Sequence, residues 1–314
     1  MSMIDLRLGD CIQLSKELED NSIDCTVTSP PYNKCGVGGG LFRKIEYAAF
    51  DDTLPEDQYQ DQKEMFKLNH DMRTRIITSP SFNQSHIIGA ILFEQTMERL
   101  VSGVPTADYL WKTKKIVPFL KVDKGLKDLK DGVRLMKDIP DLRGTLKKAA
   151  EYGIFGTKMR SVIDEDNTLG IDKIVNQQFE IGKIILDSGL VPIIEPEVTI
   201  TISQKSQAEE SLKKSLIKYL NKLQPNQNVL LKLTLPEKDN FYEDLVNHPN
   251  VLRVVALSGG YSLEEANKRL RENYGVVASF SRALTQSLFV HQNIDEFNST
   301  LEQTISAIAD ASKT

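Results

Sequence analysis

The sequence predicts an α/β fold in which a parallel sheet closes into a TIM (β/α)8 barrel, and three observations support this. From about residue 60 onward, short apolar runs rich in β-branched residues alternate with longer stretches of helical period, as in a parallel sheet with crossover helices. Seven such units in about 255 residues match a barrel in size, whereas an open doubly wound sheet usually has fewer strands. Charged residues follow several of these runs, where a parallel barrel presents its active site.

Each predicted strand is a short apolar run bounded by polar or turn-forming residues. The strands span residues 87–93, 117–122, 153–159, 191–195, 229–233, 251–257 and 276–280. Among the predicted helices, residues 171–186 place apolar side chains at helical spacing. Another helix is expected to begin at Ser262, because Ser262-Leu-Glu-Glu265 has the spacing of a capping box.

Composition limits the classes of function. The chain has 314 residues, with 39 basic and 44 acidic side chains, and no long run of one sign marks a surface for a polyanion. The amino terminus lacks the order of a signal peptide, and no stretch approaches the length of a membrane span. The three cysteines lie within the first 35 residues without a close pair, which indicates reduced thiols. We therefore expect a cytoplasmic protein with no nucleic-acid or membrane partner; a homo-oligomer is compatible with the sequence.

Polar residues at the ends of successive predicted strands indicate a common site. Taken singly, each has an ordinary reading: a lysine that snorkels, a Glu-Pro-Glu that ends a strand because proline halts the ladder, or a Ser-Gly-Gly turn. Together they favour a site, because buried charges cost several kcal/mol unless they are paired or used. The series comprises Lys121, Asp123, Lys158, Arg160, Glu195, Glu197, Lys232, Ser258, Gly259, Gly260, Ser281 and Arg282.

From about residue 56 to the end, the sequence resembles the class I fructose-bisphosphate aldolases, especially their bacterial branch. Seven segments carry the resemblance: DMRTR at 71–75, TSPSF at 78–82, GAILFEQTM at 89–97, FLKVDKG at 119–125, FGTKMR at 155–160, VPIIEPEV at 191–198 and LSGG at 257–260. The resemblance implies a lyase of glycolysis that cleaves fructose 1,6-bisphosphate to dihydroxyacetone phosphate and glyceraldehyde 3-phosphate.

The resemblance also assigns catalytic roles. Lys232 would form the Schiff base with the substrate, and Lys158 would be the neighbouring cation; desolvation beside a cation favours the neutral amine that attacks a carbonyl. Glu195 would move protons during carbinolamine dehydration and at the hydroxyl of the cleaved bond, and Glu197 would support it. The iminium is itself the electron sink, so no cofactor and no metal is expected. The histidines, at 70, 86, 248 and 291, lack ligand spacing.

Two groups of residues match the family positions that hold the substrate phosphates. Hydroxyls, glycine amides and a guanidinium suit the carbon-1 phosphate, because glycine lets the backbone approach and arginine matches the phosphate fork. That group comprises Ser258, Gly259, Ser281 and Arg282. Lys121 and Arg160 would face the other phosphate.

The first part of the chain departs from this family. Residues 1–57 resemble the start of an amino-group DNA methyltransferase, with LGDC at 8–11, NSIDC at 21–25 and TSPPYN at 28–33. In such enzymes the turn formed here by Ser29, Pro30, Pro31 and Tyr32 holds a flipped base. Nothing after residue 60 resembles their glycine-rich loop for S-adenosylmethionine. We therefore divide the chain into a short foreign α/β fragment at 1–57, with a vestigial motif, and an aldolase barrel at 58–314.

Aldolases of this family begin with a barrel strand that ends in a catalytic aspartate, and this chain has no such segment. Residues 23–28 have the β-branched composition to occupy the vacant first-strand place, which would bring Ser29 and Pro30 near the active-site rim. We expect turnover to be impaired by the loss. Two alternatives stay open at this point: a catalytically dead chimera and, less favoured, a DNA amino-methyltransferase fragment.

Overall fold

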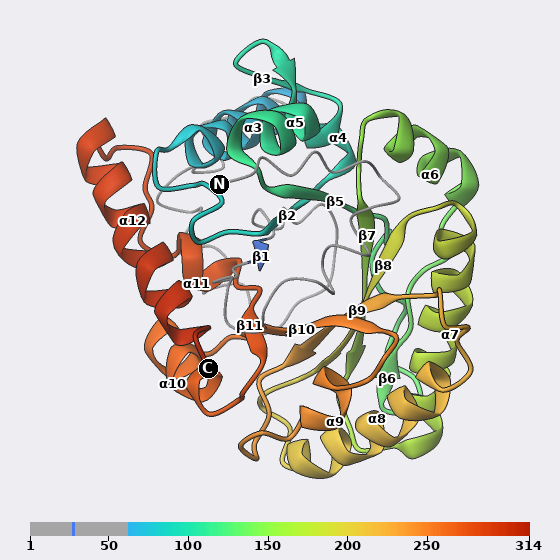
Figure 1. The fold of residues 1–314 in the computed structure, drawn as a ribbon. Coiled ribbons are helices and arrows are strands. Elements are labelled where there is room, and N and C mark those ends of the chain that lie inside the picture. The colour runs from blue at the N-terminus through green and yellow to red at the C-terminus, as the bar shows by residue number, and fades with distance from the viewer. Residues whose placement is uncertain (1–26, 29–61) are drawn as a thin grey trace.

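The computed structural model describes Val27, Thr28 and residues 62–314. Within them, parallel strands form a ring around a central axis, and the helices lie outside the ring (Figure 1). The order is that of the sequence: β1 (Val27–Thr28), β2 (Gly89–Leu92), β5 (Val117–Lys121), β7 (Gly156–Ile163), β8 (Val191–Val198), β9 (Val229–Thr234), β10 (Val251–Leu257) and β11 (Val276–Ala278). The predicted TIM-type architecture is confirmed.

The helices of the outer layer follow the strands, and all except α11 and α12, which come after β11, lie between one strand and the next in the chain. They are α3 (Gln62–Thr78), α4 (Glu94–Met97), α5 (Thr106–Asp108), the π-helical η2 (Tyr109–Lys114), α6 (Leu142–Glu151), α7 (Thr168–Asp187), α8 (Lys205–Leu220), α9 (Glu243–Val246), α10 (Leu263–Arg271), α11 (Arg282–Thr285) and α12 (Ile294–Ala311). Short strands β3 (Leu100–Val101) and β4 (Val104–Pro105) form a hairpin, and β6 (Val133–Arg134) pairs antiparallel with β7. None of the described helices is long and apolar enough to cross a membrane.

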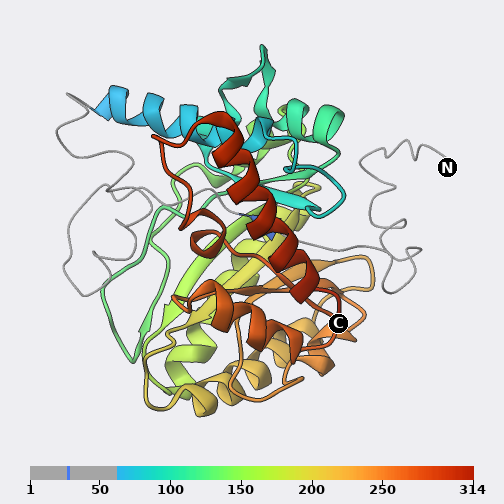
Figure 2. The same cartoon turned by 90° about the vertical axis from the view of Figure 1, so that its left-hand side faces the viewer.

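The two helices predicted from local sequence signals are present. α7 contains the predicted helix 171–186, and Asn167 begins it by accepting a hydrogen bond from the Gly170 N–H. The Ser262 side chain accepts from the Glu265 N–H, so α10 begins where the serine predicts. α12 runs along the outside of the barrel, with its amino end close to α3 (Figure 2). There the Arg75 guanidinium of α3 lies 4.0 Å from the ring centroid of Phe297 and donates to the Asn293 carbonyl.

Two strand predictions were wrong by three or more residues at an end, and β2 and β11 are shorter than the predicted 87–93 and 276–280. The strand expected at 153–159 is β7, which begins at Gly156 and continues to Ile163, because the chain is still leaving α6 at Gly153 (φ +74°) and β6 pairs with the extension. β8 was expected to end at Glu195, but it passes through Pro196 to Val198. The register of β8 with β9 ends at Ile194, so the proline lies where no bond toward β9 is lost.

The first-strand place is occupied by β1, which pairs parallel with β2 through Val27 opposite Gly89 and Thr28 opposite Ala90. The prediction for residues 23–28 is confirmed for these two residues. Residues 23–26 and the Ser29-Pro30-Pro31-Tyr32 motif lie outside the described residues.

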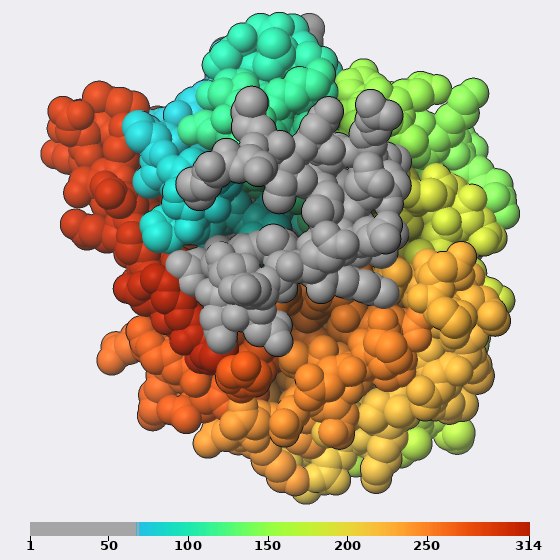
Figure 3. All heavy atoms as spheres, in the orientation of Figure 1, coloured from blue at the N-terminus to red at the C-terminus, as the bar shows by residue number. Residues whose placement is uncertain are grey.

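Alternation along the strands separates two cores. Outward residues pack against the helices in the larger core, and inward residues fill the centre of the ring, including Ile91, Phe119, Ile193, Leu230 and Val255. Seen in the orientation of Figure 1, the atoms of the described helices and loops form a nearly continuous outer rim (Figure 3). The inward positions are apolar toward the amino ends of β5, β8 and β9 and charged toward their carboxyl ends, which places the site.

Candidate active site

Period-two alternation aims the predicted site residues at the barrel centre. In β8 the inward series Val191, Ile193, Glu195 changes from apolar to charged, and in β9 Leu230 is followed by Lys232. The Lys158, Glu195 and Lys232 residues are 0, 2 and 3% exposed. The reading of these lysines as snorkelling or edge residues is therefore wrong.

A carboxylate lies between the two buried lysines. Glu195 Oε1 is 3.2 Å from Lys232 Nζ, and Glu195 Oε2 is 2.9 Å from Lys158 Nζ. Burial alone would raise the pKa of Glu195, but the charges of Lys158 and Lys232 lower it below its ordinary value. The strand order β7, β8, β9 also places Lys158 two strands from Lys232, as the sequence predicted.

Asp123 joins the same cluster from the segment that follows β5. Its Oδ1 lies 2.6 Å from Lys121 Nζ, and its Oδ2 lies 3.8 Å from Lys158 Nζ. Burial opposes ionisation of this carboxyl, but Lys158 and Lys121 lower its pKa below the ordinary value. The sequence placed Asp123 at a strand end but gave it no role. Asp123 is two residues after Lys121, and this spacing indicated that both side chains face the barrel centre.

Arg160 and Glu197 form a second pair above this cluster. Arg160 Nη1 lies 3.3 Å from Glu197 Oε2, and the arginine is more exposed than Lys158. Lys121 lies opposite Lys158 in the register of β5 and β7. Arg160, two residues beyond Lys158 on β7, therefore presents positive charge nearer the mouth of the barrel, while Lys121 lies level with Lys158.

The Ser258-Gly259-Gly260 turn follows β10 at the same end of the barrel. Gly259 and Gly260 have φ of +60° and +114°, and a Cβ on Gly259 would lie 2.8 Å from the Ile200 side chain. Only glycine fits that position without strain. Ser281 and Arg282 follow β11, the neighbour of β10, so the two predicted phosphate-binding segments leave adjacent strands.

One supporting residue was missed in the sequence. Gln178 lies in α7 on the face that packs on the barrel; its side-chain oxygen accepts a hydrogen bond from the Glu195 N–H at 2.8 Å, and its amide donates to Ser161 Oγ at 3.0 Å. A polar residue within the apolar face of the predicted helix was the available signal. Gln178 fixes the backbone that carries Glu195.

Comparisons with known proteins agree with this geometry. The family described as "Glycolytic: Fructose-bisphosphate aldolase class-I" matches residues 63–241. The chain is 57% identical over 267 residues to "Fructose-bisphosphate aldolase class 1" of Synechocystis sp., covering 85% of this chain and 89% of that protein. It is 55% identical to the protein of the same name from Porphyromonas gingivalis, covering 82% and 88%.

A solved structure shows the same fold. The fructose-bisphosphate aldolase of Plasmodium falciparum, in complex with TRAP and a small-molecule inhibitor, superposes with a TM-score of 0.71 at 20% identity. The similarity covers 98% of this chain and 94% of that one. At this identity the likeness supports the barrel architecture alone.

Proposed function

This chain belongs to the class I fructose-bisphosphate aldolase family, and we propose that Lys232 carries its chemistry as the Schiff-base lysine. The enzyme is a carbon–carbon lyase that acts on a sugar phosphate. One observation supports the assignment most directly: Lys232 is buried among apolar residues, and a carboxylate that also pairs with Lys158 lies 3.2 Å from its Nζ.

The proposed steps use these groups in turn. Lys232 first gives a proton to Glu195, and its neutral amine attacks carbon 2 of fructose 1,6-bisphosphate. Glu195 then returns that proton to the carbinolamine hydroxyl, which leaves as water. The resulting iminium accepts the electron pair when the bond between carbons 3 and 4 breaks, while Glu195 takes the proton of the carbon-4 hydroxyl. Glyceraldehyde 3-phosphate leaves. Protonation of the enamine and hydrolysis of the imine then release dihydroxyacetone phosphate and regenerate the lysine.

Lys158 would keep Glu195 in place and neutralise charge that develops during these proton transfers. It is fully buried and lies between Glu195 and Asp123, so its ammonium has a carboxylate on either side. Glu197 would support Glu195 by holding Arg160, with which it pairs. A positioned acid–base group of this kind contributes roughly 10²- to 10⁴-fold to rate.

The two phosphates would bind on opposite sides of Lys232. Ser258, Gly259, Ser281 and Arg282 would hold the carbon-1 phosphate, supported by the left-handed glycines and by the adjacency of β10 and β11. Lys121 and Arg160 would hold the carbon-6 phosphate; the partial exposure of Arg160 and the position of Lys121 on the neighbouring strand, level with Lys158, support this.

For the first part of the chain we propose the division at residue 57, with the methyltransferase-like fragment carrying no reaction of its own. The family match that begins at residue 63 supports the boundary. The glycolytic description of the family supports a cytoplasmic location and sugar phosphates, with no nucleic acid, as partners. We also propose a homo-oligomer, which measurement of the mass in solution would test.

The decisive experiment is borohydride trapping. With dihydroxyacetone phosphate and borohydride, mass spectrometry should locate the adduct on Lys232, and fructose 1,6-bisphosphate should be cleaved in the presence of EDTA. Lys218→Ala is the control variant that also lacks one lysine, since Lys218 is an exposed residue paired with Asp172 far from the barrel centre. An adduct on another lysine, or cleavage that EDTA abolishes, would contradict the assignment.

A further inference from the structure

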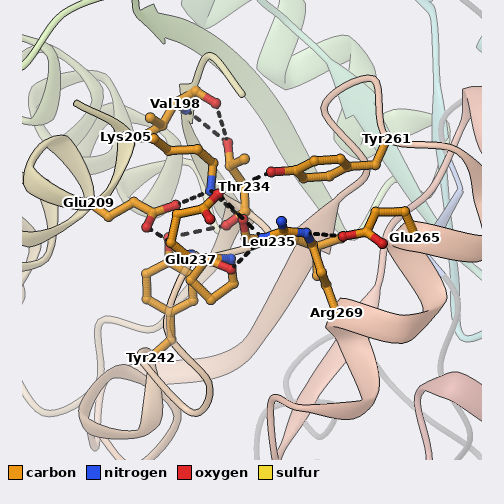
Figure 4. Close-up of polar contacts among 11 residues, drawn as sticks. Val198, Lys205, Glu209, Thr234, Leu235, Glu237, Tyr242, Tyr261, Glu265 and Arg269 are labelled. Atoms are coloured by element: carbon orange, nitrogen blue, oxygen red, sulfur yellow. Dashed lines mark hydrogen bonds and ion pairs between the residues drawn. The ribbon is translucent and has the colours of Figure 1, made fainter. Parts of the chain in front are cut away.

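A second group of charged residues, built around the buried Lys205, lies outside the Lys232 cluster among the segments that follow β8, β9 and β10. Lys205, the first residue of α8, is 4% exposed. Its Nζ pairs with Glu209, lies 3.0 Å from Glu237 Oε1 and donates to the Leu235 carbonyl at 2.8 Å (Figure 4). One buried ammonium thus ties α8 to the segment that follows β9.

Glu237 extends the group toward α10. The Tyr261 hydroxyl donates to Glu237 Oε1 at 3.2 Å, and Arg269 Nη1 lies 3.3 Å from the same oxygen (Figure 4). The Arg269 guanidinium also lies 4.5 Å from the ring centroid of Tyr261. Burial raises the pKa of Tyr261 to about 12, so its hydroxyl remains a donor at neutral pH. We call Lys205, Glu237, Tyr261 and Arg269 the loop clamp.

The loop clamp joins two segments that lead to the active site. Leu235 and Glu237 follow the strand that carries Lys232, and the Thr234 hydroxyl donates to the Val198 carbonyl at the end of β8. Tyr261 directly follows Gly259 and Gly260, the two left-handed residues of the turn after β10. Holding Tyr261 therefore fixes the outgoing end of that turn relative to β9.

These ion pairs fix a geometry more than they stabilise the fold: Lys205 and Glu209 are buried, whereas Glu237 and Arg269 are partly exposed. A buried ion pair gains little over apolar packing because desolvation offsets the attraction, but it accepts only one arrangement of its partners. Consecutive backbone N–H groups bind an anion only when the turn keeps them convergent. Lys232 and Glu195 lie on strands, and their positions depend on the sheet; the glycine turn lies beyond its strand and is closed by a 2.9 Å hydrogen bond from the Tyr261 N–H to the Ser258 carbonyl.

We propose that the loop clamp holds the Ser258-Gly259-Gly260 turn in its phosphate-binding conformation, and that Tyr261 and Glu237 are positioning residues for phosphate affinity. The inference rests on the proposed role of this turn in binding the carbon-1 phosphate. Loss of the clamp should therefore weaken ligand binding, while the bond-forming step at Lys232 depends on other elements.

Tyr261→Phe tests this with the smallest change, because it removes the hydroxyl that binds Glu237 and leaves the ring beside Arg269. We expect the dissociation constant of inorganic phosphate, measured by calorimetry, to rise about ten-fold, which corresponds to about 1.4 kcal/mol. The KM for fructose 1,6-bisphosphate should rise by a similar factor, with little change in kcat. Adduct formation at saturating dihydroxyacetone phosphate should be unchanged.

Tyr219→Phe is the matched control. It removes another tyrosine hydroxyl that donates to a carboxylate, Asp172, at 3.4 Å, and it lies on α8 outside the clamp. It should leave the phosphate dissociation constant unchanged. Glu237→Gln is a second variant in which Lys205 keeps its pair with Glu209, and thermal melting checks that both variants fold.

The combination of Tyr261→Phe and Glu237→Gln decides the mechanism. If the two residues act through one hydrogen bond, the double variant should weaken phosphate binding by less than the product of the single effects. A phosphate dissociation constant within about two-fold of wild type in Tyr261→Phe, or multiplicative effects, would overturn the clamp. Absence of a Lys232 adduct in wild type, with the phosphate shift intact, would overturn the proposed chemistry and leave the clamp standing.

Discussion

Replacing Glu195 by glutamine separates the covalent role of Lys232 from proton transfer. The amide keeps the size of the side chain but can neither take up a proton nor offset the charges of Lys158 and Lys232, whose Nζ atoms lie 2.9 and 3.2 Å from its carboxylate oxygens. Loss of a positioned acid–base group lowers kcat by roughly 10²- to 10⁴-fold. At about 1.4 kcal/mol per ten-fold, this is about 3–5 kcal/mol of transition-state stabilisation.

The assay is steady-state cleavage of fructose 1,6-bisphosphate beside borohydride trapping of dihydroxyacetone phosphate on the same preparations. Glu195→Gln should retain some trapping because Lys232 still supplies the bond, while kcat falls. Glu197→Gln is the matched control: its carboxylate pairs with Arg160 at 3.3 Å, so a smaller loss of kcat is expected. If Glu195→Gln kept kcat within about ten-fold of wild type, Glu195 would not be the main proton-transfer group.

The other changes act on separate parts of the cluster. Lys232→Ala should abolish the borohydride adduct; equal trapping in this variant and in wild type would exclude Lys232. Asp123→Asn should lower the free energy of unfolding near pH 7 by about 3–5 kcal/mol, because it breaks buried pairs with Lys121 and Lys158. The pKa of Asp123 is lowered from 3.8 in the folded protein, so its contribution is present above that value and is lost as pH falls through the lowered pKa. Chemical denaturation from pH 7 to pH 2 should show the difference between wild type and variant shrinking in acid, and a pH-independent difference would contradict this origin.

The approximate strand positions and the buried cluster of charged residues could be predicted because they depend on local signals. β10 spans the predicted residues 251–257, and β5 and β9 differ from prediction by one residue at their carboxyl ends. Each is a β-branched or apolar run between polar turns. The parallel order follows from chain order, so charged residues at successive strand ends had to meet at one end of the ring.

Details that depend on register or on distant partners could not be predicted. β7 and β8 continue past their predicted ends because the partner strands extend with them, from Gly156 opposite Val191 to Ile163 opposite Val198. The bond from the Glu195 N–H to Gln178 joins residues 17 positions apart through helix–sheet packing. The loop clamp likewise joins side chains from three connections, and its members are ordinary surface types in sequence.

The first strand is the part of the barrel from which we expect a functional deficit. Val27 lies opposite Gly89 in the register of β1 and β2. The sequence has no Asp or Glu between Asp24 and Glu46 that could supply the aspartate expected at the end of this strand. The phosphate site proposed at Ser258, Gly259 and Arg282 follows β10 and β11, so phosphate binding there should persist.

Replacing the first 55 residues by an aldolase amino terminus that supplies the expected strand-end aspartate should therefore raise kcat by about 10²-fold or more, the contribution of one positioned carboxylate, and leave the phosphate dissociation constant unchanged. Calorimetry with inorganic phosphate and steady-state cleavage measure the two quantities separately. The same replacement with its strand-end aspartate changed to asparagine is the control, since it restores the strand without the carboxylate. Equal turnover in the original chain and in the replaced chain would show that β1 and its neighbours already supply what the reaction needs.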